Sequence, residues 1–277
     1  MLNDAEDIAA QIANRLSRDI DDLTAAFGPP DPHRVRWCAI DDVLPESFAE
    51  EAFHDLPALP EMVRRADDKE RKYVTANIDK LNETVRRLVI ALNSPKIANV
   101  VARIMGKREL QTDTLLYNGG VTVMAPGDFM RPHLDNSHDF NRSRRREVVL
   151  LFYISPHWED RYGGALSVWP NARKNGPTPI AFRPNRLVIM ETTDDSWHSV
   201  DPIIGPMPRA NVIAYYYASP ADKSPVRLTH FAAWPNEPIR NALFQAEFHM
   251  RNFVARLGVR RPTKNKHVYE AASTTAM

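Results

Sequence analysis

The chain has 277 residues, long enough to bury one sizeable hydrophobic core. Its 36 Lys and Arg residues nearly balance its 35 Asp and Glu residues, and a formal net charge of +1 gives no global electrostatic reason to expect nucleic acid or an anionic membrane as a partner. We therefore expect one main domain that acts on a small molecule or on a protein.

The amino-terminal residues and the cysteine content favour a cytoplasmic protein. The stretch MLNDAEDIAAQIANRL carries acidic residues where a secretory signal would carry basic ones. Cys38 is the one cysteine and cannot form a disulfide within the chain. No apolar run approaches the roughly eighteen residues that span a bilayer, so no membrane partner is expected.

The first 109 residues are predicted to form a helical support region. Residues 4–27 place Ile8, Ile12 and Leu16 among apolar residues at steps of three and four, which is typical of an amphipathic helix, and FGPPDP ends it. This helix could pack on the body or on a second subunit. After a short strand in RWCAIDDVLP, residues 46–66 and 79–105 are predicted to be helical, and NSP at 93–95 separates two helices in the second segment.

From about residue 110 the pattern changes to short segments rich in β-branched and aromatic residues. The predicted strands are TLLY, GVTVMA, FMRPHLD, EVVLLFYIS, ALSVWP, PIAF, RLVIMET, SVDPII and NVIAYYYAS. With no helix-length pattern between them, these strands predict an antiparallel sandwich or barrel such as a jelly roll. An extension from 221 to 277 adds one more helix, predicted at 236–257, and the three regions form a single domain overall.

The stretch RPHLDNSHD at 131–139 concentrates metal-ligand chemistry. His133 and Asp135 are one residue apart, so in an extended segment both side chains project from the same side, whereas His138 and Asp139 fall outside that register. His198, at the end of the strand RLVIMETT, is the expected third ligand. Two histidines and one carboxylate on one face of an ion are typical of non-haem Fe(II) oxygenases, although a zinc hydrolase could use the same ligands.

Arg209 distinguishes between these two chemistries. It stands eleven residues after His198, at the start of the strand RANVIAYYY. A guanidinium that faces into a barrel already holding a metal pairs best with a carboxylate. A dicarboxylic 2-oxo acid would chelate iron at one end and meet this arginine at the other.

The ordered set HLD at 133–135, RREVVLLFYIS, YGGALSVWP, RPNRLVIMETTDDSWHSV and RANVIAYYY resembles the catalytic core of the prolyl-4-hydroxylase-like branch of the Fe(II)- and 2-oxoglutarate-dependent dioxygenases. The resemblance covers roughly residues 110–219. It implies a mainly β fold with flanking helices, whose core at 110–220 is a double-stranded β-helix of the jelly-roll or cupin-like type.

The resemblance also implies the roles of individual residues. His133, Asp135 and His198 would ligate Fe(II), Arg209 would pair with the far carboxylate of 2-oxoglutarate, and Tyr153 would donate its hydroxyl to that carboxylate. No catalytic side chain is expected beyond the iron ligands. The implied cofactors are Fe(II), 2-oxoglutarate as cosubstrate and O2, with ascorbate as an optional addition.

The chain departs from the family pattern at two places. Asn211 stands where the family often has a serine or threonine that also reaches the cosubstrate. The stretch VTVMAPGDF lacks a tyrosine that some relatives carry there, and Tyr117 is too far upstream to take that role. Asp135 is intact, whereas halogenating relatives have a small residue at this position, so hydroxylation is favoured.

Other polar and aromatic candidates have simpler interpretations. His157 and Glu159 are predicted to lie in a surface connection, and the run RSRRR at 142–146 is favoured as solvated charge over a grip on an anionic substrate. Tyr215, Tyr216 and Tyr217 are predicted to pack in the core or on the sheet face. The alternative for Tyr153, an inward aromatic that only fills the barrel, is the less favoured of its two interpretations.

The predicted function is therefore hydroxylation of an unactivated C–H bond in a small molecule such as an amino acid, a sugar or a natural-product intermediate. Two alternatives stay open: a protein (prolyl) hydroxylase, which would want a long open groove, and a non-catalytic jelly-roll protein that binds metal as a sensor. The motifs do not specify the substrate. A homodimer is a candidate assembly, through the first helix or the helix at 236–257.

Overall fold

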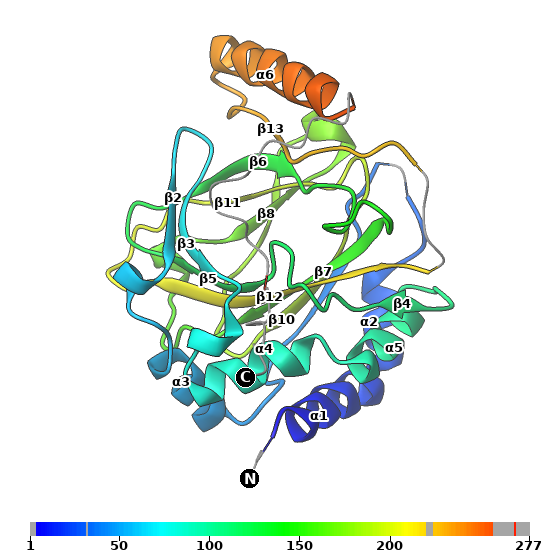
Figure 1. Cartoon of the computed structure of the whole chain (residues 1–277), viewed down its shortest axis with the longest axis vertical. Coiled ribbons are helices and arrows are strands. Elements are labelled where there is room, and N and C mark those ends of the chain that lie inside the picture. Colours follow the sequence, from blue (N-terminus) through cyan, green and yellow to red (C-terminus); the bar gives the residue numbers. More distant parts are fainter. Residues whose placement is uncertain (1–3, 32, 220–223, 257–268, 270–277) are drawn as a thin grey trace, which may run out of the picture.

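The computed structural model describes residues 4–31, 33–219, 224–256 and 269, and two antiparallel β-sheets form its centre (Figure 1). The helices are α1 Ala5–Arg18, α2 Ile20–Phe27, α3 Glu46–His54, α4 Glu83–Leu92, α5 Pro95–Ile104 and α6 Pro238–Arg256, with 3₁₀ turns at Leu59–Glu61, Ile78–Lys80, Asp160–Tyr162 and Asn171–Arg173. The strands are β1 Trp37–Ile40, β2 Val63–Ala66, β3 Arg71–Thr75, β4 Leu110–Gln111, β5 Gly120–Met124, β6 Met130–Leu134, β7 Arg146–Tyr153, β8 Leu166–Trp169, β9 Thr178–Ile180, β10 Leu187–Glu191, β11 Trp197–Val200, β12 Arg209–Ala218 and β13 His230–Phe231.

The strands divide into a large and a small sheet. The large sheet has the order β1-β10-β7-β12-β5-β3-β2, with β4 paired to β12, and the small sheet has the order β13-β6-β11-β8-β9. Apolar side chains from both sheets, such as Val149 and Leu151 of β7 and Leu166 and Val168 of β8, share one buried cluster. The sheets therefore pack face to face, and the predicted mainly β, jelly-roll core with flanking helices is confirmed.

Strand β7 shows how alternation separates two cores. Val148, Leu150 and Phe152 belong to the cluster shared with the helices, whereas Val149 and Leu151 belong to the cluster between the sheets. Because successive strand residues point to opposite faces, a continuous apolar run such as VVLLFY is expected where both faces of a strand are buried.

Helices α1 to α5 lie on one side of the molecule, below the large sheet in Figure 1. Ile8, Ile12 and Leu16 are fully buried, and α1 contacts α4 and α5. The predicted helix at 4–27 is thus two helices that break at Asp19, and its apolar face packs on the body rather than being free for a second subunit. The predicted separation at 93–95 is confirmed, since the Ser94 side chain caps α5.

Two segments differ from their predicted structure. The prediction of a helix over 46–66 is wrong after His54, because prolines at 57 and 60 end the helix and the chain continues into the hairpin β2–β3. TLLY at 114–117 forms turns rather than a strand. The first 109 residues consequently supply three strands, β1, β2 and β3, to the large sheet in addition to their helices.

The carboxy-terminal helix is confirmed as α6, and it lies at the top of Figure 1, beyond β13. The short strand β13, which the sequence pattern did not indicate, pairs with β6 and so links this region to the small sheet. Among the described helices, none is long and apolar enough to cross a membrane.

Candidate metal centre and cosubstrate site

Pairing of β6 with β11 brings two of the predicted ligands together. His133 and His198 are directly opposite each other in the register of these strands, and their ring centroids lie 4.1 Å apart. Asp135 follows β6 by one residue, and its Oδ1 lies 3.9 Å from Nε2 of His133. One ligand atom from each of the three residues lies within 4.8 Å of the others, which is close enough for all three to hold a single metal ion.

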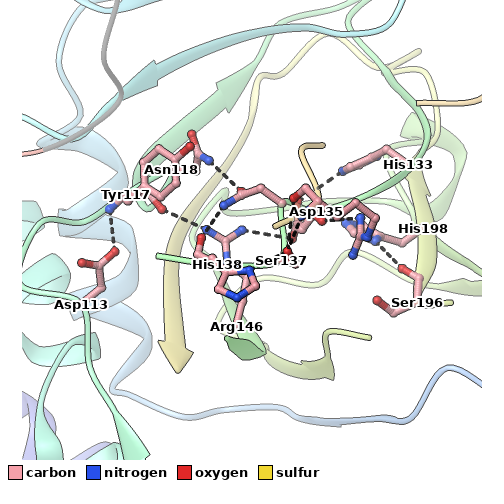
Figure 2. A network of polar contacts seen from close by, with 12 residues as sticks. Asp113, Tyr117, Asn118, His133, Asp135, Ser137, His138, Arg146, Ser196 and His198 are labelled. Carbon is pink, nitrogen blue, oxygen red and sulfur yellow. Dashed lines mark hydrogen bonds and ion pairs between the residues drawn. The ribbon is translucent and has the colours of Figure 1, made fainter. Parts of the chain in front are cut away.

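Both histidines are oriented by backbone carbonyls, and Figure 2 shows the contact between His198 and Ser196. Nδ1 of His133 lies 2.8 Å from the carbonyl oxygen of Arg131, and Nδ1 of His198 lies 3.0 Å from that of Ser196. A carbonyl can only accept, so each Nδ1 carries the proton and donates it. The lone pair is then on Nε2 of each ring, where a metal would bind, and the carbonyl fixes the direction of the ring.

Burial and neighbouring charges set the protonation states of His133 and Asp135. Desolvation, with the His198 imidazole close by, lowers the pKa of His133 to about 3, so the His133 imidazole is neutral near pH 7. Burial alone would raise the pKa of Asp135, but His198 and Arg146 outweigh it, and the pKa lies below its ordinary value. The donor set is therefore a neutral imidazole and a carboxylate, together with His198.

Arg146, the last residue of the RSRRR run, is a part of this site that the sequence interpretation missed. It is 1% exposed, and its Nη1 lies 3.7 Å from Oδ2 of Asp135 (Figure 2). The register of β7 with β12 shifts between Tyr216 and Tyr217, so that Tyr217 pairs with Arg146. Such a β-bulge inserts one extra residue and turns the side chains beyond it to the other face. The prediction of solvated charge is thus wrong for Arg146, because the bulge directs its side chain into the space between the sheets.

Tyr215 and Tyr217 flank this arginine. The Arg146 guanidinium lies 3.5 Å from the ring centroid of Tyr215, and its Nη2 donates to the Tyr217 hydroxyl at 3.4 Å. Tyr216 faces the helices instead and donates to the carbonyl of Leu92 at 2.6 Å. The predicted core packing holds for Tyr216, whereas Tyr215 also lines the cavity described below.

Arg209 is buried at the start of β12 and is held on two sides. Its Nε donates to the carbonyl of Gly164 at 2.8 Å, and its Nη1 donates to Oδ1 of Asn211 at 3.0 Å. Gly164 has φ +69°, and a Cβ there would lie 3.1 Å from Cδ of Arg209, so the turn approaches the arginine more closely than a larger residue allows. Asn211 therefore positions the guanidinium, and Arg209 lines the cavity with a cation suited to a carboxylate.

Tyr153 lies beside Arg209 but is not among the residues that line the cavity. Its ring stacks on Phe182 with centroids 4.3 Å apart, and the Arg209 guanidinium lies 4.9 Å from its centroid. The side chain is fully buried, and its hydroxyl has no hydrogen-bond partner among the described residues. Oδ2 of Asp135 is likewise buried and accepts no hydrogen bond from the described residues. Buried polar atoms of this kind need partners, and a metal and an anionic cosubstrate would fit them.

A cavity of about 310 Å³ is lined by the three candidate metal ligands and by Arg209. Its inner wall is formed by the ligands and by apolar side chains of both sheets, including Met124, Val149 and Leu151. Its mouth lies between the β2–β3 hairpin and the segment of β13 and α6, which contributes Phe231, Glu247 and Arg251. The volume lies at the lower end of the range of about 300–1,000 Å³ that is common for small-molecule sites.

The remaining candidates lie outside this cavity. His138 is buried, but its ring nitrogens face the hydroxyls of Ser137 and Ser224, at 2.7 and 3.4 Å, and it is not a member of the ligand group. Asp139 accepts backbone and hydroxyl hydrogen bonds within its own turn. The side chain of His157 is 78% exposed, so the surface position predicted for it is confirmed.

Comparisons with known proteins agree with this geometry. Residues 119–217 match the family model described as the 2OG-Fe(II) oxygenase superfamily. This segment contains His133, Asp135, His198 and Arg209. No curated protein matches the chain in sequence.

Solved structures similar to this chain include a prolyl 4-hydroxylase from Phytophthora capsici, 16% identical, with a TM-score of 0.53 over 88% of this chain and 75% of that one. A prolyl-4-hydroxylase from Pseudomonas putida is 17% identical, with a TM-score of 0.49 over 73% of this chain and 97% of that one. HygX from Streptomyces hygroscopicus, solved with nickel, 2-oxoglutarate and hygromycin B bound, is 12% identical, with a TM-score of 0.48 over 73% and 87% of the two chains. Over residues 119–217 this chain is thus similar to the 2OG-Fe(II) oxygenase superfamily, and its fold is similar to that of the prolyl 4-hydroxylase from Phytophthora capsici.

Proposed function

We propose that this chain is a 2-oxoglutarate-dependent dioxygenase that hydroxylates an unactivated C–H bond of a small molecule, with Fe(II) held by His133, Asp135 and His198. The observation that carries the proposal is the convergence of one ligand atom from each of two imidazoles and one carboxylate within 4.8 Å, with each imidazole oriented by a carbonyl at its Nδ1. When bound, Fe(II) with 2-oxoglutarate and O2 supplies the oxidising chemistry, and the protein supplies position and shielding.

We assign Arg209 to the far carboxylate of 2-oxoglutarate, with Asn211 holding the guanidinium in place. Tyr153 would donate its unpartnered hydroxyl to the same carboxylate. Burial of all three side chains excludes water from this end of the site, which strengthens the pairing of opposite charges.

The form of the cavity favours a small molecule over a polypeptide substrate. The turn of the β2–β3 hairpin is joined to β6, because the amide of Arg131 donates to the carbonyl of Lys69 at 2.9 Å. Lys69 also forms an ion pair with Glu247 of α6. These contacts close one side of the cavity mouth, whereas a prolyl hydroxylase that acts on a protein would require a long open groove for the polypeptide.

The test is formation of succinate from 2-oxoglutarate by the purified protein in the presence of Fe(II), ascorbate and O2. His133→Ala and Asp135→Ala should abolish it, and a chelator should remove it reversibly. His157→Ala serves as the matched control and should turn over like the wild type, because this histidine is exposed outside the cavity. If the iron-loaded wild type never consumes 2-oxoglutarate, even slowly and without substrate, the non-catalytic metal-binding alternative replaces the proposal.

We also propose that α6 mediates a homodimer. Ile239, Leu243, Ala246, Met250 and Phe253 follow one another at steps of four and three, the spacing of a coiled-coil seam, and all are exposed. Arg240 and Glu247 flank this stripe seven residues apart, so an antiparallel pair of α6 helices would place opposite charges side by side. The mass in solution, measured by light scattering, should be that of a dimer and should fall to that of a monomer in Leu243→Glu. Ile204→Glu, which alters an exposed isoleucine elsewhere, should not change it.

A cytoplasmic location stays a prediction. It is supported by the single cysteine, Cys38, which is buried in the core and has no disulfide partner.

A further inference from the structure

Charged side chains gather at the mouth of the cavity, and we call Arg65, Lys69, Glu70, Lys72, Glu247 and Arg251 the mouth cluster. Four belong to the β2–β3 hairpin and two to α6. Each carboxylate serves two cations. Glu70 pairs with Lys72 and Arg65, and Glu247 pairs with Lys69 and Arg251.

The mouth cluster has more positive than negative charge. Its four cations and two carboxylates leave a surplus of two positive charges. Asp67 also lines the cavity, and with it the surplus is one. The carboxylate of Asp67, however, accepts the backbone N–H groups of Lys69 and Glu70 at 2.7 and 3.0 Å within the hairpin turn. A group that enters through this mouth therefore meets a cationic field despite the near-neutral charge of the whole chain.

Lys72 is the member of the cluster best placed to contact a substrate. Its side chain is 13% exposed and points to the cavity face of β3, as expected from its alternation with Tyr73, which packs against the helical core. It shares the cavity wall with His133 and Asp135. Lys72 is thus a cation beside the proposed metal site rather than a surface charge.

The hydrogen bonds of Lys72 are incomplete. Its Nζ lies 2.8 Å from Oε2 of Glu70, and its other polar contact within the described part of the chain is with the thioether sulfur of Met130 at 3.5 Å. An ammonium has three donors, and a thioether is a weak acceptor. An anionic oxygen would replace the sulfur as a much stronger acceptor, at a place where little solvent reaches the cation.

The backbone around Lys72 is held firmly, which makes this a built site. The amide of Arg71 donates to the carbonyl of Phe129 at 2.8 Å, and Glu70 forms a bridge with Met130 at the start of β6. The hairpin therefore spans from the large sheet to the small one. Preorganisation of this kind reduces the entropy lost when a ligand binds.

We propose that Lys72 binds an anionic group, a carboxylate or a phosphate, of the primary substrate, and that Glu70 positions its ammonium. This inference rests on the proposed function, since it concerns the substrate of the same cavity. It narrows the substrate class to small acids and excludes neutral molecules as preferred substrates.

The test uses the full chain with Fe(II) and saturating 2-oxoglutarate under anaerobic conditions, so that binding is read without turnover. The probes are three pairs that differ by one anionic group: N-acetyl-leucine and N-acetyl-leucinamide, N-acetyl-proline and N-acetyl-prolinamide, and glucose 6-phosphate and glucose. Saturation-transfer NMR and calorimetry measure their affinities. We expect at least one anionic member to bind about tenfold or more tightly than its neutral partner.

Variants connect this preference to the residue. Lys72→Met should remove the preference for the anionic probe and leave the affinity for its neutral partner unchanged, and Lys72→Arg should restore most of it. Lys80→Met, which removes an exposed lysine outside the cavity, is the matched control and should behave as the wild type. Circular dichroism checks folding, and Lys72→Gln replaces the Met variant if that variant does not fold.

Three outcomes overturn the inference. The first is that no anionic probe binds more tightly than its neutral partner, and the second is that the preference for the anionic probe persists in Lys72→Met. The third is that Lys72→Met lowers the affinity for 2-oxoglutarate and leaves the affinities for the probes unchanged. Failure of the proposed function is a separate result, because it is read from the absence of 2-oxoglutarate consumption in air by the wild type without any probe.

Discussion

The pair formed by Arg146 and Asp135 allows the electrostatics of the site to be measured before any substrate is known. Both side chains are largely or fully buried, and Nη1 of the arginine lies 3.7 Å from Oδ2 of the aspartate. Replacing Arg146 by methionine removes the charge and keeps much of the volume. Without metal, Asp135 then loses its nearest permanent cation in a site where water cannot replace it.

The size of the effect follows from the separation. Opposite unit charges about 4 Å apart attract by about 4 kcal/mol at an effective dielectric constant of about 20. Couplings measured between contacting residues are about 0.5–3 kcal/mol. We therefore expect Arg146→Met to lower the free energy of unfolding by about 3 kcal/mol through the loss of this pair, in addition to the loss of its contacts with Tyr215 and Tyr217.

Urea unfolding of four metal-free proteins isolates the pair: the wild type, Arg146→Met, Asp135→Asn and the double variant. Arg146→Met removes the stacking on Tyr215 both in the wild type and in Asp135→Asn. This loss therefore cancels from the coupling free energy between Arg146 and Asp135. Ni(II) should then stabilise Arg146→Met more than the wild type, since the metal restores the missing positive charge beside Asp135. The reasoning is refuted if Arg146→Met costs as much stability in the Asp135→Asn background as in the wild type.

Three further predictions concern the cosubstrate end and the link to α6. Arg209→Met should raise the KM for 2-oxoglutarate about tenfold or more, because hydrogen bonds to charged groups are worth about 1.5–3 kcal/mol; an unchanged KM in succinate assays would contradict its assignment. Gly164→Ala should lower the free energy of unfolding in urea by about 2 kcal/mol or more and should weaken 2-oxoglutarate binding. The reason is that Gly164 has φ +69°, and a Cβ there would lie 2.8 Å from the Ile203 side chain and 3.1 Å from the Arg209 side chain. Gly106→Ala, with the same φ and nothing within 4 Å, is its control and should lose only about 1 kcal/mol and keep 2-oxoglutarate binding. Burial lowers the pKa of His230, which donates to Gln245 of α6 at 2.7 Å, from 6.5 to about 4. The folded state therefore resists protonation, so stability falls as the pH drops from 6.5 to about 4, by roughly 1–2 kcal/mol after allowance for solvent screening. Urea unfolding at pH 7 and 4.5 should show a smaller loss in His230→Gln, and an equal loss in both proteins would count against this origin.

The features predicted correctly from the sequence are those that depend on short segments of the chain. His133 and Asp135 share one strand face, and their spacing suffices to predict that they point the same way. The short segments rich in β-branched and aromatic residues predicted the jelly-roll core, and NSP at 93–95 predicted the separation of two helices. The place of Arg209 at a strand start predicted a carboxylate partner for it, and the family resemblance added an expected role for Tyr153 that no local pattern indicates.

The sequence interpretation failed where one residue changes the side of a strand or where a strand depends on its partner. The bulge before Val148 turns Arg146 into the site, and nothing in RSRRREVV distinguishes it from a solvated run. The hairpin β2–β3 has a polar sequence, and β2 lay within the predicted helix at 46–66, because β3 is stabilised by pairing with β5 and β2 by pairing with β3 rather than by an apolar face of their own. Lys72 and Glu70 were missed as cavity residues for the same reason.

The sequence by itself determined which side chains can bind a metal and a carboxylate, because ligand chemistry and strand periodicity are local properties. Only the tertiary structure decided which of them meet. His133 and His198, sixty-five positions apart, become neighbours through the register of β6 with β11. Arg146 and Lys72 reach the cavity through a bulge and a hairpin, whose positions are set by hydrogen bonds between strands distant in the chain. Contacts of that kind depend on which surfaces pack together, and that depends on the whole chain rather than on any single segment.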